Sequence, residues 1–264
     1  MVKSRLIFTL LMQDGIYMLS RNFSLQAVGG LDWIREHYDF DAISFSIDEL
    51  VVLNVIRGEG NIKQFSRHLI ELSKRCFIPI AAGGGIRTLK DAYTLLDSGA
   101  DKLVVNTTLL THPELISLLI KTFGSQCIIA SIDYRRVGGK TEVFISNGSQ
   151  PTDLTAEEVA KKAEALKCGE IYLTSMDKDG TGQGLDLEII KRVNESVGIP
   201  VIASGGAGKY DHLADAIRYG NVSAVSTANL FNFISGGLTE ARLTMQNRGI
   251  DMAVWKPESR SLKQ

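Results

Sequence analysis

Two stretches of sequence decide the fold: residues 77–86 read FIPIAAGGGI, and residues 198–207 read GIPVIASGGA, 121 positions later. Each reads as a short apolar strand that runs into a glycine-rich turn, so one half of the chain is a duplicate of the other. A second pair of segments agrees, because residues 128–133 (IIASID) match residues 6–11 (LIFTLL) at an offset of 122. The acidic residue that ends the later segment, Asp133, corresponds to Leu11 in the earlier one.

Bulk composition restricts the class of protein. With 264 residues, 44% of them hydrophobic, the chain is long enough for one large α/β domain. A net charge of −1 gives no electrostatic reason to expect nucleic-acid or membrane binding. The apolar run near the N-terminus is too short for a signal peptide or a spanning helix. The three cysteines, Cys76, Cys127 and Cys168, are far apart in apolar contexts, as in the core of a reduced cytoplasmic protein, which we expect this to be.

Short apolar runs alternate with helical-period segments along the whole chain, which predicts buried parallel strands joined by helices. We expect strands at residues 6–11, 42–47, 78–82, 102–105, 127–133, 170–174, 200–203 and 224–226. Helices are expected at 31–38, 64–74, 89–97, 113–123, 155–166, 187–196, 210–218 and 238–248, and a hairpin strand at 142–145. Two matching sets of four βα units favour a closed (β/α)₈ TIM barrel over an open doubly wound sheet, which would not explain the symmetry. The prediction is one barrel domain over residues 1–250 and a polar tail over 251–264.

The glycine-rich turns after the third and seventh strands predict two anion sites at the mouth of this barrel. Backbone N–H groups can approach a phosphate closely at such turns, and the helix that follows adds its dipole. A single Gly-Gly-Gly turn is weak evidence, but two related turns across one mouth suggest a ligand with a phosphate at each end. The candidate phosphate-binding residues in the turns, and in the loops after the fourth and eighth strands, are Gly83, Gly84, Gly85, Asn106, Thr107, Gly205, Gly206, Ala228 and Asn229.

Two further acidic features lie at strand ends. In the loop 177–181 (DKDGT), Gly180 and Thr181 can donate to phosphate, and Asp177 or Asp179 could fix a hydroxyl group or a helix N-terminus. Asp179, Gly180 and Thr181 are therefore further candidates for the phosphate site, and the alternative is a solvated acidic turn. Asp133 ends an otherwise apolar strand, where burial would tune it for general acid or base chemistry; the alternative is a capping role. The histidines lack metal-ligand spacing, and the sequence indicates neither a metal nor a redox cofactor.

Several of these motifs together resemble the cyclase subunit of imidazole glycerol phosphate synthase, a barrel of histidine biosynthesis. The matching segments are GGGIR at 83–87, GADK at 99–102, FGSQ at 123–126, LTSMDKDGT at 173–181 and IASGGAG at 202–208. The resemblance implies a (β/α)₈ barrel docked on a glutaminase, whose ammonia passes through the barrel to a ribulosyl-formimino nucleotide with two phosphates. Cyclisation and elimination would then give imidazole glycerol phosphate and an aminoimidazole carboxamide ribotide.

The chain departs from this family where the chemistry is expected. The family uses two acidic residues, of which Asp133 fills the second position and Leu11 falls on the first. The lysine of the family's first loop falls on Leu19, and its aspartate at the end of the second strand falls on Ile47, with Asp48 one residue away. Loss of a single general acid or base typically lowers a rate by about 10²–10⁴.

The opposite end of the barrel keeps more of the family pattern. The family gates ammonia with a ring of four charged residues, and three of them match Arg5, Lys102 and Glu170. The fourth, a glutamate, falls on Ala42, with Asp41 beside it. Buried charges are costly unless they are paired, so a gate explains them better than stability does, although a structural ring of ion pairs is an alternative.

These observations favour a divergent paralogue that binds a glutaminase and conducts ammonia to a third enzyme. The resemblance implies that this enzyme would be an amidotransferase that builds acetamidino sugars of surface polysaccharides. A genuine cyclase with rearranged catalytic groups is the first alternative. A non-catalytic phosphate-binding scaffold is the second alternative, and it fits less well because the matching motifs extend beyond the phosphate turns.

Overall fold

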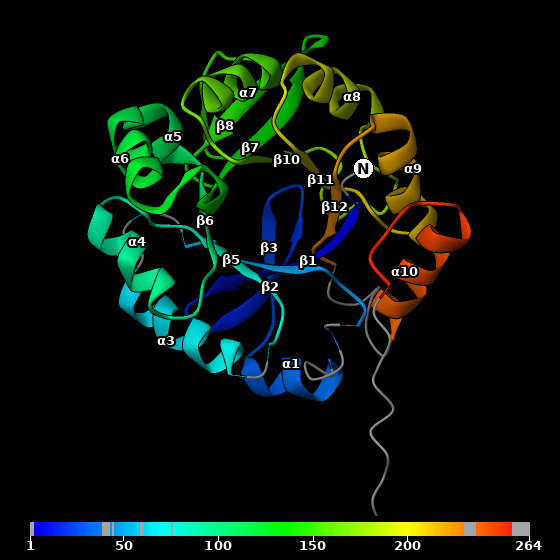
Figure 1. The fold of residues 1–264 in the computed structure, drawn as a ribbon, viewed down its shortest axis with the longest axis horizontal. Coiled ribbons are helices and arrows are strands. Elements are labelled where there is room, and N and C mark those ends of the chain that lie inside the picture. The colour runs from blue at the N-terminus through cyan, green and yellow to red at the C-terminus, as the bar shows by residue number, and fades with distance from the viewer. Residues whose placement is uncertain are drawn as a thin grey trace, which may run out of the picture.

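A closed barrel of parallel strands forms the centre of the molecule, as predicted. The computed structural model describes residues 3–38, 43, 45–56, 58, 61–74, 76–229 and 236–254. Each barrel strand pairs in parallel with the next, and β12 returns to β1, so the ring of strands is closed (Figure 1). The barrel strands are β1 (Arg5–Gln13), β4 (Glu49–Asn54), β5 (Ile80–Gly83), β6 (Lys102–Val105), β7 (Ile128–Val137), β10 (Glu170–Ser175), β11 (Val201–Ser204) and β12 (Ala224–Thr227).

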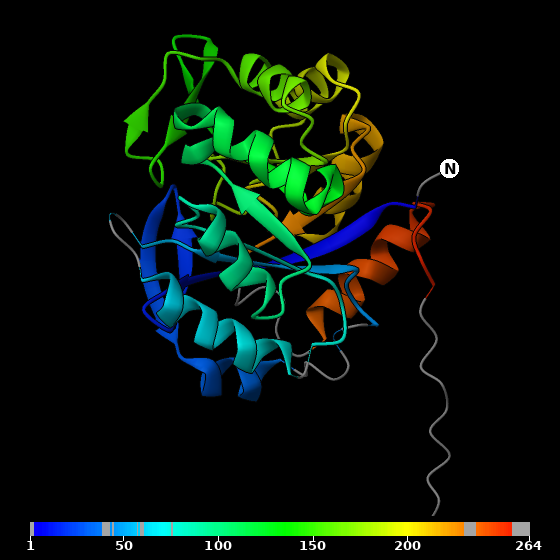
Figure 2. The ribbon, with the colours of Figure 1, turned by 60° about the vertical axis from the view of Figure 1, so that its left-hand side comes forward.

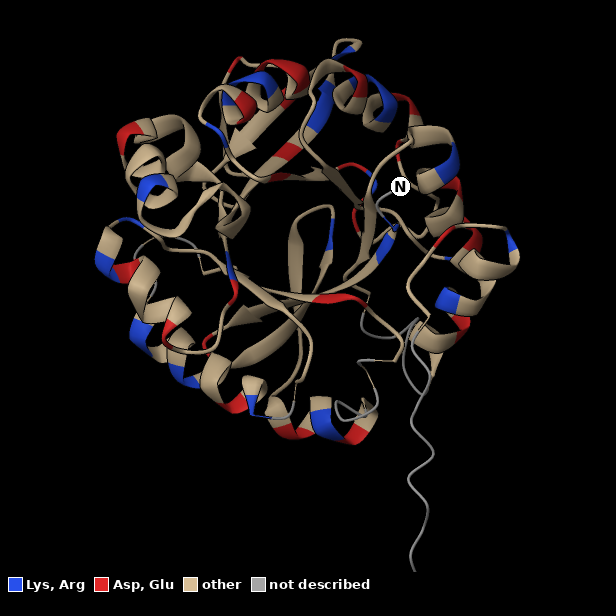
Figure 3. Ribbon diagram, in the orientation of Figure 1, with Lys and Arg blue, Asp and Glu red and all other residues tan. Residues whose placement is uncertain are grey.

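Helices surround this barrel and cover its outer face (Figure 1). Their buried residues pack against the strands, while Lys, Arg, Asp and Glu of both signs alternate on their outer sides (Figure 3). The predicted helix over 155–166 begins with a capping box, in which Thr155 and Glu158 satisfy each other's backbone N–H groups. The helices are α1 (Leu31–His37), α3 (Ile62–Ser73), α4 (Leu89–Leu96), the short α5 (Thr107–Thr111), α6 (Pro113–Phe123), the 3₁₀ turn η1 (Ser125–Cys127), α7 (Ala156–Ala165), α8 (Leu187–Ser196), α9 (Tyr210–Gly220) and α10 (Gly237–Asn247).

Two antiparallel extensions rise from equivalent strands of the two halves. The predicted hairpin after the fifth barrel strand is present as β8 (Lys140–Ile145), which pairs with β7 and with the short β9 (Gln150–Pro151). A hairpin that we did not predict, β2 (Ile16–Arg21) and β3 (Ser24–Gly29), follows β1. Figure 2 shows both extensions at the end of the barrel where β1 ends, opposite the N-terminus.

The second barrel strand is not where we predicted it. The expected strand over 42–47 is wrong, because Ile43 is helical, Phe45 and Ser46 form a turn, and the strand is β4, Glu49–Asn54. The predicted gate position Ala42 and its neighbour Asp41 lie outside the described residues. This shift changes which residues lie at both ends of the second strand.

The ends of the described chain meet at the base of the barrel. Ser4 forms a parallel bridge with Met252, which is buried, so residues at the start of the predicted tail pack against the barrel. All three cysteines are buried and unpaired by disulfides. Within the described ranges, no helix combines the length and the apolar character needed to cross a membrane.

Candidate functional site

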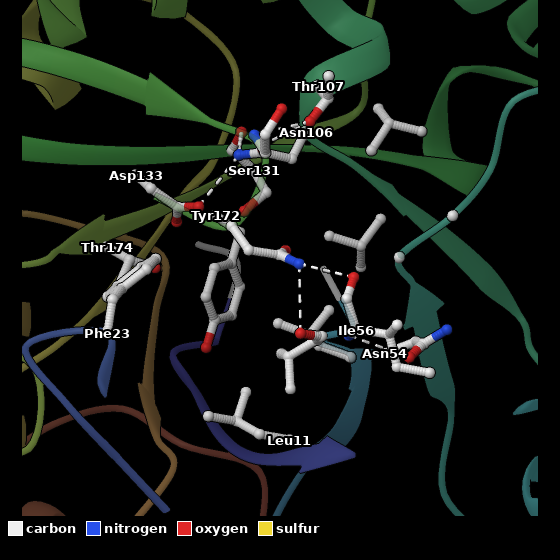
Figure 4. A pocket seen from close by; sticks show the side chains of 18 of the residues that line it. Leu11, Phe23, Asn54, Ile56, Asn106, Thr107, Ser131, Asp133, Tyr172 and Thr174 are labelled. Atoms are coloured by element: carbon white, nitrogen blue, oxygen red, sulfur yellow. Dashed lines mark hydrogen bonds between the residues drawn. The ribbon is translucent and has the colours of Figure 1, made fainter. Parts of the chain in front are cut away.

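The carboxyl ends of the barrel strands surround a pocket of about 600 Å³. Polar side chains of the fourth, fifth and sixth strands line one part of it, while Leu11, Leu53 and Val55 line another. Figure 4 shows Leu11 and Asp133 on opposite sides of this pocket. The two halves of the barrel therefore contribute different chemistry to one cavity.

Asp133 is an acidic group of this pocket, where its place at a strand end predicted it. Its Oδ2 accepts a hydrogen bond of 3.1 Å from Asn106 Nδ2 (Figure 4). Burial raises the pKa of Asp133 to about 7, and the negative charge of Asp179 makes a smaller contribution in the same direction. A side-chain hydrogen bond with Thr174 acts in the opposite direction and lowers the pKa. A carboxyl group with this pKa can exchange a proton near neutral pH, which is what a general acid or base requires.

Replacement of Asp133 by asparagine should therefore stabilise the fold at alkaline pH. The folded pKa of Asp133 lies above its unfolded value, so the wild-type protein loses stability as the pH rises from about 4 to about 7. Asp133→Asn removes this cost and keeps an acceptor for Asn106, so we expect a gain of about 1–3 kcal/mol at pH 8. Urea unfolding at pH 8 and pH 4 measures it, and the gain should disappear at pH 4. An equal gain in stability at pH 4 and pH 8 would contradict the raised pKa of Asp133.

Leu11 lies where the resemblance places the first acidic residue of the family, and its surroundings are also apolar. In the register of β1 and β4 it pairs with Leu53, and both side chains line the pocket. Leu19, on β2, packs against the hydrophobic core instead of supplying a charge. The first half of the mouth therefore presents aliphatic side chains where ionisable groups were expected from the resemblance.

The aspartate that the resemblance places at the end of the second strand corresponds to Asn54. Our alignment of that aspartate with Ile47 is wrong, because β4 ends at Asn54 and Ile47 is buried before the strand begins. Asp48 also lies at the other end, where it forms an ion pair of 2.9 Å with Arg242 of α10 and accepts from Leu6 N. An amide thus occupies the pocket position, and it can hydrogen bond but cannot carry the family's charge.

The first glycine turn opens into the pocket. Gly84 and Gly85 both have positive φ and line the cavity together with Asn106 and Thr107. A Cβ at Gly84 would lie 2.1 Å from the carbonyl oxygen of Asn54, whereas one at Gly85 would meet nothing within 4 Å. Glycine is required at the first position by this close approach, and backbone N–H groups beside an open position can approach an anion.

The second glycine turn packs against the loop that follows β10. Gly205 and Gly206 have positive φ, and a Cβ on them would lie 2.7 Å from Ser175 O and 2.3 Å from Gly184 O respectively. Thr181 Oγ1 donates to Lys178 O at 2.7 Å. Ala228 lines the pocket, whereas the backbone N–H of Asn229 donates to Thr227 Oγ1 at 3.4 Å.

Asp179 lines the pocket and also holds the β2–β3 hairpin. Its Oδ2 accepts hydrogen bonds from Ser20 Oγ at 2.5 Å and from the backbone N–H of Phe23 at 3.1 Å. A Cβ at the neighbouring Gly180 would lie 2.1 Å from Ser20 O, so the hairpin lies directly on this loop. The hairpin donors thus occupy one carboxylate oxygen of a residue that we expected to act at a phosphate.

A closed ring of four charges lies at the opposite end of the barrel. Arg5 contacts Glu49 at 3.0 Å and Glu170 at 3.1 Å, and Lys102 contacts the same two glutamates at 3.0 and 3.2 Å. Each residue is the first of its strand, so all four side chains converge at the base of the lumen. We predicted three members and missed Glu49, which is only 3% exposed. The sequence feature that could have identified Glu49 is a charged residue directly before the apolar run 50–53.

Comparisons with known proteins identify the family to which the chain is similar. Residues 42–234 match the family model described as "Histidine biosynthesis protein". The chain is 38% identical over 256 residues, which is 97% of its length and 95% of the relative's, to a protein of Parasynechococcus marenigrum (strain WH8102). That protein is named "Putative imidazole glycerol phosphate synthase subunit hisF2". No group of His, Cys, Asp and Glu with the arrangement of a metal site occurs among the residues that the structure describes.

Proposed function

The chain belongs to the histidine biosynthesis protein family, and we propose that it is a barrel subunit that accepts ammonia from a glutaminase and conducts it to an acceptor enzyme. Its relationship to imidazole glycerol phosphate synthase subunits supports a place in a glutamine amidotransferase complex. The acceptor would be a third enzyme that amidinates a sugar of a surface polysaccharide. In this scheme the barrel supplies the path and the activation of the glutaminase, and the partner supplies the acceptor chemistry.

The complete ring of Arg5, Glu49, Lys102 and Glu170 is the observation that carries this proposal. Four ionised side chains at the base of a barrel cost desolvation energy, and ion pairs alone rarely repay that cost compared with apolar packing. A ring that closes the lumen and opens by movement of one side chain gives these charges a function. Because the ring faces the outside at the amino ends of the strands, a glutaminase docked there would deliver ammonia to it.

The altered mouth supports the transfer of chemistry to a partner. By the resemblance, Leu11 and Asn54 take the places of two acidic residues and Leu19 takes that of a lysine, while four charges form a ring at the base. A conduit needs the ring and a path, whereas a cyclase also needs the acid and base groups. The complete ring therefore supports the conduit more than the cyclase.

A genuine cyclase is the second candidate, and Asp133 favours it. A carboxyl group with a pKa raised to about 7 is suited to proton transfer at neutral pH. The turnover experiment argued in the Discussion separates this candidate from the conduit.

Anion binding at the first glycine turn is expected in either case. The backbone donors near Gly84 and Gly85 do not depend on the altered side chains. Titration with inorganic phosphate, followed by backbone amide NMR shifts, should show saturable changes at these two residues. Gly85→Asp, which puts a negative charge at the open position, should abolish them, and unchanged binding in that variant would contradict this site.

Stimulation of a glutaminase tests the proposed function directly. We expect the glutaminase subunit of the same source to be nearly silent alone and to hydrolyse glutamine at least about tenfold faster when the barrel is added, since docking would order its active site. Ammonia release at fixed glutaminase and increasing barrel concentration measures this effect. Absence of both binding and stimulation would overturn the proposal.

A further inference from the structure

A cluster of four hydroxyl groups lies inside the barrel, between the charged ring and the pocket. Inward-facing residues recur at every second position of a strand, so Arg5, Ile7, Thr9 and Leu11 form one inward column on β1. From the base of the barrel to the pocket, this column holds the charge of Arg5, the buried apolar side chain of Ile7, the hydroxyl group of Thr9 and Leu11, which lines the pocket. On β10, Tyr172 follows Glu170 in the same way and stands among the apolar side chains of the lumen.

Hydrogen bonds join these hydroxyls into one network. Tyr172 Oη lies 2.8 Å from Thr9 Oγ1, 2.9 Å from Ser226 Oγ and 3.1 Å from Ser204 Oγ, and Thr9 lies 2.8 Å from Ser226. A phenol has one proton, so Tyr172 donates in only one of its three contacts at a time and accepts in the others. Tyr172 Oη is the donor toward Ser204 and toward Ser226, one at a time, whereas the contacts of Thr9 with Tyr172 and with Ser226 can run in either direction.

These contacts leave oxygen lone pairs of the hydroxyl groups open, because each hydroxyl oxygen has two. Ser204 accepts only from Tyr172, and Thr9 can accept from one neighbour while it donates to the other, so each of these oxygens keeps a lone pair for another donor. Both residues line the pocket, as does Tyr172, which Figure 4 shows at its centre. The network is therefore a set of acceptors, which suits a molecule that arrives with N–H groups to donate.

The network also has no charge of its own, and this decides which form of such a molecule it admits. Burying a cation without a counter-charge costs far more than burying a neutral N–H donor that finds acceptors. The column below it is apolar, and in the ring at the base Arg5 and Lys102 are already balanced by Glu49 and Glu170, so no net negative charge is left to compensate a cation in the lumen. Neutral ammonia meets acceptors along this route, whereas ammonium meets none of the compensation that it needs.

We propose that Tyr172, Thr9, Ser204 and Ser226 form a hydroxyl collar that passes neutral ammonia, and not ammonium, from the charged ring to the pocket. The inference rests on the proposed conduit and adds its selective element. Tyr172 is the central member, because it contacts the three others and extends from the apolar layer to the floor of the pocket.

Tyr172→Phe tests this collar in the barrel assembled with its glutaminase and the sugar amidotransferase. The quantity measured is amidinated product formed per glutamine hydrolysed, together with product formed from ammonium chloride added to the solution. We expect product per glutamine to fall about fivefold, as for the loss of one hydrogen-bonding group from a buried path. Product from external ammonium should be unchanged, because that nitrogen reaches the acceptor enzyme without crossing the lumen.

Tyr134→Phe is the matched control, since it removes another buried phenol hydroxyl, from β7, whose side chain belongs to the outer core and not to the lumen. It should leave the coupling unchanged. If Tyr172→Phe does not fold, Ser204→Ala removes one acceptor with less disruption and should also lower product per glutamine. Coupling within twofold of the wild type in a folded collar variant would overturn the inference. A wild-type barrel that never stimulates the glutaminase would instead overturn the proposed function, and the collar with it.

Discussion

Supplied with saturating ammonium and the formimino nucleotide, the purified barrel should form imidazole glycerol phosphate about 10²–10⁴ times more slowly than a family member with both acidic residues. The reason is Leu11, which cannot accept or donate a proton at the position opposite Asp133 (Figure 4). Asn54 and Leu19 add to the deficit, because neither supplies the charge that the resemblance implies. Single-turnover and steady-state product formation, measured without a glutaminase, give the rate. A kcat within tenfold of ordinary cyclase subunits would contradict this expectation and favour the cyclase candidate.

Restoration variants show whether Leu11 alone is responsible. Leu11→Asp places a carboxylate beside Leu53, in an aliphatic part of the pocket that would disfavour its ionised form. We therefore expect little recovery from this single change and more from Leu11→Asp combined with Asn54→Asp. Asn54→Asp alone is the matched control, because it restores a charge without the missing acid or base.

The sequence was sufficient for the barrel because its evidence is periodic and repeated. Apolar runs between helical segments marked seven of the eight barrel strands, and the duplication explained why they form two sets of four. The same duplication also contained a signal that we did not use. The predicted extension near residue 139 after the fifth strand implied a counterpart near residue 15 after the first, and the structure has it as β2 and β3.

The second strand was misplaced because its evidence is not local. Residues 42–54 (AISFSIDELVVLN) contain two segments that each read as a strand, 42–47 and 50–53, and the Asp48-Glu49 pair between them resembles the polar end of the first. Their charges are compensated by partners far away in sequence, since Asp48 binds Arg242, and Glu49 binds Arg5 and Lys102. Nothing in the window around residue 49 indicates these partners, so the ring could be predicted only in part. Asp179 is similar, because its contact with Ser20 depends on a hairpin 159 residues away.

Removing one cation of the ring should uncouple ammonia transfer while the barrel stays folded. Lys102→Met keeps the aliphatic stem and leaves both Glu49 and Glu170 bound to Arg5. An unpaired buried charge would cost about 3–5 kcal/mol of stability, and we expect a smaller loss here because both glutamates keep a partner. Product per glutamine should fall about tenfold or more, because the ring no longer closes. Urea unfolding and the ratio of product to glutamine hydrolysed measure the two effects.

The pH dependence of that variant separates a ring of charges from a loss of packing. Burial raises the pKa of Glu49, and the charge of Lys102 is the largest influence that lowers it. In Lys102→Met the folded pKa of Glu49 should rise further above its unfolded value, so the variant gains relative stability as the pH falls from 8 to 5. Lys74→Met, which breaks an exposed ion pair with Glu71 on the outer surface, is the control and should cost less than about 1 kcal/mol without uncoupling. Full coupling in Lys102→Met would show that the ring stabilises the base of the barrel but does not gate it, because a gate cannot lose a member that contacts both glutamates and still control the lumen.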